Sequence, residues 1–126
     1  QVLVTSKNHR NDILKKLIQK IHFKKVNIMG SIGYKIASIV RGESDIYICL
    51  SLPGKSSPKD WDFAAPEAIL KAAGGAITTL DCKPLTYGKP NFEQDGIIVA
   101  SSNLVNHMNV CLQIKEIIEN SQIYPF

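Results

Sequence analysis

Hydrophobic positions follow two different spacings along this chain. In residues 12–21 they recur every three or four residues, as on one face of an α-helix, and the apolar members are Ile13, Leu14, Leu17, Ile18 and Ile21. Helices are likewise expected at 34–40, 62–73 and 102–119. The last of these has its apolar residues at Leu104, Met108, Cys111, Leu112, Ile114, Ile117 and Ile118. Short apolar runs predict strands at 2–5, 26–29, 46–50, 76–80 and 96–100.

The predicted strands alternate with the predicted helices. This order is typical of an α/β domain, and we expect a mixed sheet flanked by helices on both sides. Gly42 stands just past one helix, where a left-handed cap residue is needed, and Gly74-Gly75 stops another. With 126 residues, of which 44% are hydrophobic, the whole of 1–126 is expected to form one domain.

Charge and composition narrow the range of partners. The net charge of +4 favours anionic partners such as phosphates. The basic residues are scattered, however, and lack the interleaved aromatic residues of a single-strand binder, so we expect no nucleic-acid partner. No apolar run approaches the roughly 20 residues that a membrane span needs. The odd count of three cysteines, without a secretory signal, fits a reducing compartment, and we expect a cytoplasmic protein.

Residues 61–75 are the most informative stretch for chemistry. They place Asp62 at the start of a predicted helix, followed by small residues and then by Gly74-Gly75. The ordinary interpretation is that Asp62 caps the helix, because Asp is among the best cap residues. Trp61 is interpreted as a packing residue that keeps the neighbouring carboxylate rigid and partly dry. Pro66 is tolerable only in the first turn of a helix.

Several motifs occur together in a characteristic order. They are W-D-x-A-A followed by G-G at 61–75, G-S-x-x-x-K at 30–35, D-x-Y at 45–47, an Asp and Pro-Leu at 81–85, and V-A-S at 99–101. In this order and spacing the chain resembles the inositol monophosphatase superfamily over nearly its whole length. The resemblance implies the C-terminal subdomain of the αβαβα sugar-phosphatase fold. It also implies that Asp62 is a ligand of a catalytic Mg²⁺, a metal that prefers hard oxygen ligands.

One branch of the superfamily fits best. Ala-Ala-Pro-Glu after the metal Asp, S-x-x-H at Ser6 and His9, and a Lys four residues after the turn Ser are similar to 3'(2'),5'-bisphosphate nucleotidases. The resemblance implies that Ser6 and His9 touch the nucleoside and sugar. It implies that Ser31 and Lys35 hold the phosphate that is not cleaved. The expected substrate is a nucleotide such as adenosine 3',5'-bisphosphate.

Each of these residues also has a plain structural interpretation. Ser6 fits a strand-end cap, and His9 fits a solvated turn. Ser31 fits the N-cap of its helix, and Lys35 fits an exposed helix position, the usual place of Lys. Cys82 stands where the superfamily usually has Gly, which strains the turn if this position needs a positive φ.

Part of the superfamily pattern is missing from this chain. There is no G-x-E and no D-P-x-D-G-T, which supply the other metal carboxylates and activate the attacking water in the superfamily. Because these motifs are missing, we expect an N-terminal half, as one chain or a companion chain, to be its partner. The chain also lacks an initiator Met, which suggests that it begins inside a longer sequence or after processing. Without that half we expect no activity. Two alternatives stay open: an inositol monophosphatase or other sugar phosphatase, and a truncated, non-catalytic module that binds a nucleotide or anion.

Overall fold

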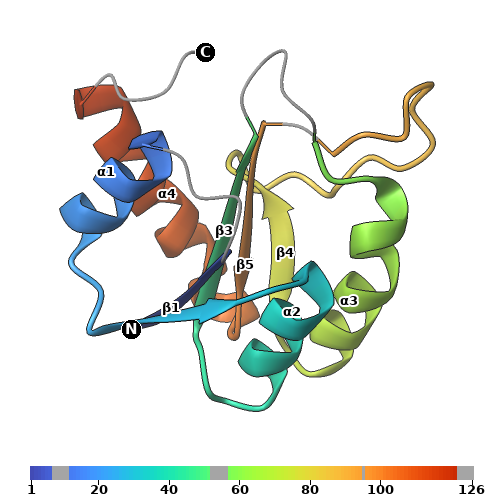
Figure 1. Cartoon of the computed structure of the whole chain (residues 1–126), viewed down its shortest axis with the longest axis horizontal. Coiled ribbons are helices and arrows are strands. Elements are labelled where there is room, and N and C mark those ends of the chain that lie inside the picture. Colours follow the sequence, from blue (N-terminus) through green and yellow to red (C-terminus); the bar gives the residue numbers. More distant parts are fainter. Residues whose placement is uncertain (7–11, 52–56, 95, 122–126) are drawn as a thin grey trace.

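The fold is a sandwich of three layers, with one sheet between two pairs of helices (Figure 1). We describe a computed structural model, which covers residues 1–6, 12–51, 57–94 and 96–121. The strands are β1 (Val2–Ser6), β2 (Lys25–Met29), β3 (Ile46–Ser51), β4 (Ala76–Thr79) and β5 (Gly96–Ser101). The helices are α1 (Asp12–Ile21), α2 (Ile32–Val40), α3 (Asp60–Ala72) and α4 (Leu104–Ser121). None of these helices is both long and apolar enough to cross a bilayer.

The sheet is mixed, as the sequence predicts. Its strand order is β2-β1-β3-β5-β4. Strand β1 pairs in parallel with β2 and β3, whereas β5 runs antiparallel to β3 and β4. The carboxyl ends of β1, β2 and β3 therefore meet at one edge of the sheet. Helices α2 and α3 begin at this edge, because each follows one of the parallel strands.

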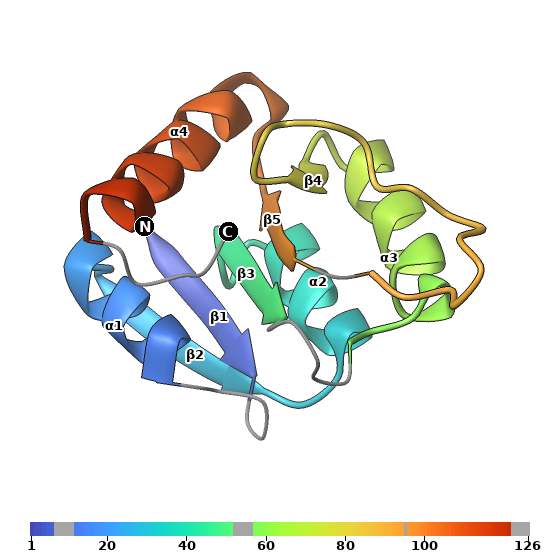
Figure 2. The same ribbon diagram turned by 90° about the horizontal axis from the view of Figure 1, so that it is seen from above.

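The two faces of the sheet bury separate hydrophobic clusters. Helices α1 and α4 cover one face, and α2 and α3 cover the other (Figure 2). Strand β3 shows why: Ile46 and Ile48 point into the α1/α4 cluster, and Tyr47 between them points into the α2/α3 cluster. Side chains alternate between the faces of a strand, so a strand buried on both sides is apolar throughout.

Helix α4 buries a different face from the one that its apolar residues suggest. Leu104, Met108 and Leu112 are apolar, yet they are 65%, 60% and 57% exposed. The buried positions are His107, Val110, Cys111, Ile114 and Ile118. Their spacing of three and four residues is that of one helical face, and the first buried residue on this face is a histidine. The helix carries apolar residues on two faces, and the sheet covers only this one.

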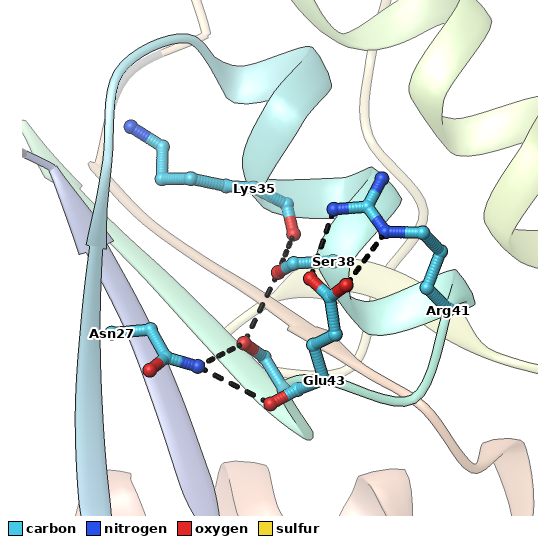
Figure 3. A network of polar contacts seen from close by, with 6 residues as sticks. Asn27, Lys35, Ser38, Arg41 and Glu43 are labelled. Carbon is cyan, nitrogen blue, oxygen red and sulfur yellow. Dashed lines mark hydrogen bonds and ion pairs between the residues drawn. The ribbon is translucent and has the colours of Figure 1, made fainter.

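Side-chain bonds fix the far end of α2 against the sheet. The Ser38 hydroxyl donates to the Lys35 carbonyl (2.7 Å) and lies 3.1 Å from the Ser44 hydroxyl, which accepts from Asn27 Nδ2 at 3.1 Å (Figure 3). Gly42 ends the helix with φ +82°, as expected from its position. The Lys35 side chain points away from this network (Figure 3). The helix is thus anchored at one end while its lysine extends toward the other.

Candidate active site

The carboxyl edge of the parallel strands gathers most of the predicted site residues. Ser6 ends β1, Ser31 precedes α2, and Asp62 lies in the first turn of α3. In open α/β sheets, ligands bind outside the carboxyl ends of the strands. The amino ends of helices add unpaired N–H groups and a partial positive charge, both of which suit an anion.

Asp62 is the third residue of its helix rather than the cap. Helix α3 begins at Asp60, two residues earlier than the sequence suggests, and Lys59 occupies the cap position. One carboxylate oxygen of Asp62 (Oδ2) accepts from the Lys59 N–H at 2.9 Å. Among the described residues the other oxygen has no hydrogen-bond partner, and the residue is exposed. Asp62 therefore holds the helix start with one oxygen and presents the second outward.

A second carboxylate in the same turn has a different role. Asp60 accepts from the Gly88 N–H and from Gln94 Nε2, both at 2.7 Å. Both of its oxygens thus tie the long loop after β4 to the start of α3. Asp62 and Asp60 are two residues apart, yet only Asp62 has an oxygen to spare for a ligand.

Two sequence interpretations of this helix are wrong. Trp61 is 67% exposed and lies beside the Phe92 ring, with the ring centroids 6.4 Å apart, so it does not bury the neighbouring carboxylate. The first turn packs on the sheet through Phe63 instead, which is fully buried. Pro66 lies inside the helix, beyond the first turn. Because proline lacks an N–H, the carbonyl of Asp62 loses its usual partner four residues on.

Lys35 is buried, not exposed, so its interpretation as a surface lysine is wrong. Its side chain is 2% exposed. The ammonium donates to Ser6 Oγ at 2.7 Å and to the Gly30 carbonyl at 2.9 Å, and it lies 5.1 Å from the centre of the Tyr47 ring. An ammonium has three donors, so one remains for another acceptor. Lys35 joins the end of β1 to the turn before α2.

The sequence carried a signal for this burial. Lys35 stands at the third position after Ile32, on the face that also holds Ile36 and Ile39. Residues at this spacing share one face of a helix. Ile36 and Ile39 are buried in the α2/α3 cluster, so the helix carries the lysine into the same layer.

Burial and neighbouring charges shift the acidities of this group. Burial lowers the pKa of the Lys35 ammonium from its ordinary 10.5. Burial raises the pKa of the Tyr47 phenol well above its ordinary value, and it raises that of the Cys49 thiol, which the Lys35 charge opposes. The Asp62 carboxylate adds a smaller upward contribution to both. Asp62 and Lys35 therefore both act electrostatically on the Cys49 side chain, with opposite signs.

Of the remaining predicted residues, Ser31 and Ser6 are described by the structure and His9 is not. Ser31 is the N-cap of α2, as its plain interpretation predicts, and its hydroxyl accepts from the Tyr34 N–H at 3.2 Å. Ser6 is buried at the end of β1, where it meets Lys35. His9 lies outside the described residues. Sequence reasoning missed Tyr47 and Cys49 as neighbours of the site, although both stand on β3 with the α2/α3 face.

The chemistry of this edge suits a negatively charged ligand. The described residues contain no group of three or more carboxylate, histidine or cysteine side chains that could hold a metal ion. Asp62 fits Mg²⁺ as a single oxygen ligand, because its outward oxygen is exposed and free of other partners in the described parts of the chain. Further ligands must come from outside these residues.

The sequence profile of the inositol monophosphatase family matches residues 1–119. The chain belongs to this family. Among curated family members, the rat 3'(2'),5'-bisphosphate nucleotidase 1 is 32% identical over 104 residues, which cover 81% of the chain and 32% of that protein. The 3'(2'),5'-bisphosphate nucleotidase CysQ of Buchnera aphidicola is 37% identical over 86 residues, covering 68% of the chain and 30% of that protein. The chain thus spans about a third of these relatives' length.

Solved structures of the inositol monophosphatase family share the fold. The Thermotoga maritima IMPase superposes with a TM-score of 0.67 at 24% identity, over 94% of this chain and 42% of that one. CysQ from Bacteroides thetaiotaomicron, described as a bacterial family member, gives a TM-score of 0.64 at 26% identity, over 81% of this chain and 37% of that one. Mixed sheets flanked by helices are thus common to these family members and to this chain.

Proposed function

We propose that this chain is the C-terminal part of a Mg²⁺-dependent phosphomonoester hydrolase that acts on 3'(2'),5'-bisphosphate nucleotides, such as adenosine 3',5'-bisphosphate. The observation that carries the proposal is the placement of Asp62. Its outward carboxylate oxygen lies at the edge of the sheet where Ser6, Ser31 and the Lys35 ammonium also gather. A metal-binding oxygen beside an anion-binding edge is what a phosphatase needs.

Membership of the inositol monophosphatase family supports the reaction class, and the similarity to bisphosphate nucleotidases supports the substrate. Asp62 would hold Mg²⁺ through its free oxygen. When bound, such a metal orients water and neutralises charge on the leaving oxygen. This chain's own task is to keep the carboxylate fixed, which the bond from the Lys59 N–H does.

Lys35 and its partners would hold the second phosphate of the nucleotide. A phosphate that enters beside Ser6 and Ser31 meets the amino end of α2 and the remaining donor of the Lys35 ammonium. The bonds of that ammonium to Ser6 and to the Gly30 carbonyl keep it in place before the ligand arrives. His9 stays a prediction for the nucleoside side.

The proposal requires ligands that this chain does not carry. We propose that the N-terminal half of the same enzyme, as one chain or a companion chain, supplies the other metal carboxylates. We also propose a cytoplasmic location, which three free thiols at Cys49, Cys82 and Cys111 suit. The alternatives remain an inositol monophosphatase or other sugar phosphatase, and a binding module without catalysis.

One assay separates these possibilities. The full-length protein that contains this chain is tested for phosphate release from adenosine 3',5'-bisphosphate and from inositol 1-phosphate, with Mg²⁺ and with a chelator. We expect Mg²⁺-dependent hydrolysis with a clear preference for the nucleotide. A preference for inositol 1-phosphate would be consistent with a phosphomonoester hydrolase but would refute the proposed nucleotide substrate. Nucleotide binding by calorimetry without any hydrolysis would favour the binding module.

A further inference from the structure

Two of the three cysteines come together on the face of the sheet opposite the candidate site. Cys82 lies in the turn after β4, and Cys111 lies on α4. The Cys82 N–H donates to the Thr79 carbonyl at 3.0 Å, and Cys111 Sγ lies 4.0 Å from the same oxygen. The half-buried Cys82 side chain packs against the hydrophobic cluster that contains Cys111. Residues 29 positions apart in sequence thus converge on one carbonyl group.

A second contact holds the turn against the same helix. Lys115, one helical turn after Cys111, forms an ion pair with Asp81 at 2.8 Å. The turn is also closed internally, because the Thr79 N–H donates to the Lys83 carbonyl at 2.9 Å. Cys82 has a φ of +62°, which few residues other than glycine adopt. The fold therefore keeps a cysteine, in a conformation that favours glycine, beside another cysteine.

The two thiols differ in accessibility. Burial raises the pKa of Cys111 to about 12, and contact with the Cys82 thiol adds to this, so Cys111 stays protonated. Cys111 Sγ lies 3.5 Å from His107 Nε2, which is suited to take its proton when it reacts. Cys82 is the more exposed of the pair and the first that a dissolved oxidant meets.

We propose that Cys82 and Cys111 are an oxidative modification site, at which hydrogen peroxide converts the two thiols to a reversible disulfide. The Cys82 thiolate attacks one oxygen of the peroxide, forming a sulfenic acid and releasing water after protonation. The Cys111 sulfur then attacks the Cys82 sulfur, its proton leaves, and the sulfenic hydroxyl departs as a second water. Two thiols are oxidised and one peroxide is reduced to two waters. The disulfide ties the turn after β4 to α4.

The third cysteine provides an internal control. Cys49 belongs to the α2/α3 cluster, on the other face of the sheet from Cys111. In the folded protein it is separated from both members of the pair by the sheet itself. A disulfide that depends on the native fold must therefore exclude Cys49. A disulfide formed in an unfolded chain has no such restriction.

The test is peptide mapping of the folded full-length protein after treatment with hydrogen peroxide and alkylation of the remaining thiols. We expect one crosslinked peptide pair that joins residues 82 and 111, the loss of two hydrogen atoms, and complete reversal by dithiothreitol. Cys49→Ser should give the same crosslink, whereas Cys82→Ser and Cys111→Ser should abolish it. In urea, pairs that include Cys49 should appear. Recovery of Cys82 and Cys111 as separate alkylated or over-oxidised residues from the folded protein would overturn the proposal, as would pairing with Cys49.

Discussion

Among the described residues, each face of the sheet buries one basic side chain, and the two side chains differ in the charge state that their surroundings favour. On the α2/α3 face, Lys35 is 2% exposed and bonds to Ser6 and to the Gly30 carbonyl. On the α1/α4 face, His107 is 3% exposed and lies 2.6 Å from the Ser101 hydroxyl and 2.7 Å from the Thr78 hydroxyl. The lysine brings a charge into the interior, and the histidine is suited to be neutral.

The difference indicates which of the two buried basic residues has a task in ligand binding. Both ring nitrogens of His107 are used, and hydroxyl partners can donate or accept as its tautomer requires. No carboxylate of the described residues forms an ion pair with Lys35, and a buried charge without such compensation is costly. We infer that the cost at Lys35 is kept for an anionic ligand, whereas His107 connects α4 to the sheet and needs no such ligand.

Removing the lysine charge should give the largest change in substrate binding. Lys35→Met in the full-length enzyme keeps an unbranched apolar chain of similar length, and it leaves the Ser6 hydroxyl and the Gly30 carbonyl without this donor, so we expect a moderate loss of stability as well. We expect KM for adenosine 3',5'-bisphosphate to rise by about ten- to a hundred-fold, because a charge-assisted hydrogen bond is lost. KM for inositol 1-phosphate should change much less. The measurement is a side-by-side assay of both substrates.

A matched control for this variant is Lys71→Met on α3, where the lysine side chain is 60% exposed. It should leave both KM values unchanged. If Lys35→Met unfolds the protein, or alters the two activities equally, Lys35 is a structural residue. In that case Lys35 and His107 do not differ in role, and the inference that Lys35 binds an anionic ligand is wrong.

Removing the histidine should instead change stability. His107→Leu removes the bonds of His107 to the Ser101 and Thr78 hydroxyls, which keep their bonds to the carbonyls of Asn103 and Thr79. We expect the free energy of unfolding to fall by about 1–3 kcal/mol, since each of the two lost hydrogen bonds contributes about 0.5–1.5 kcal/mol. The measurement is urea unfolding, with KM for the nucleotide as a second readout that should not move. The exposed His22, at φ 58°, offers the control His22→Asn, which should have no effect on either.

Acid should lower the free energy of unfolding through His107, in a pH window that the pKa of this residue sets. Burial lowers the pKa of His107 below its ordinary 6.5, so the folded state takes up the proton less readily than the unfolded state. The contribution of neutral His107 to the free energy of unfolding is therefore fully present above pH 6.5. It decreases as the pH drops below 6.5, by at most about 1.4 kcal/mol per pH unit. Urea midpoints at pH 7 and pH 5.5 test this. His107→Leu should lack this component, and an equal loss in the variant would assign the effect to other groups.

The sequence predicted the fold better than it predicted the site's interior. The mixed sheet, the Ser31 cap and the Gly42 helix end follow from local patterns, which act over a few residues. A tryptophan beside a helix start is usually predicted to pack in the core. Here Phe63 occupies the buried position of the first turn, and Trp61 is exposed. The expected strain at Cys82 is confirmed by its φ of +62°.

Burial of polar residues was the harder part to predict. Lys35 and His107 both share a helical face with apolar residues. Hydrophobic periodicity counts only apolar residues, so it does not predict that a lysine or histidine on that face is buried. Their burial depends on partners that are distant in sequence, Ser6 for the lysine and Ser101 with Thr78 for the histidine. Only the packed sheet brings these pairs together.

The most direct test of the account compares Asp62→Asn with Asp60→Asn in the full-length enzyme. Asparagine at 62 can still accept from the Lys59 N–H, so the helix start should survive, while the metal-binding oxygen is lost. Asparagine at 60 weakens the bonds to Gly88 and Gln94 that hold the loop. We predict that Asp62→Asn abolishes Mg²⁺-dependent phosphate release with near-normal unfolding, and that Asp60→Asn lowers stability but retains turnover. Near-normal activity of Asp62→Asn at saturating Mg²⁺ would contradict the account.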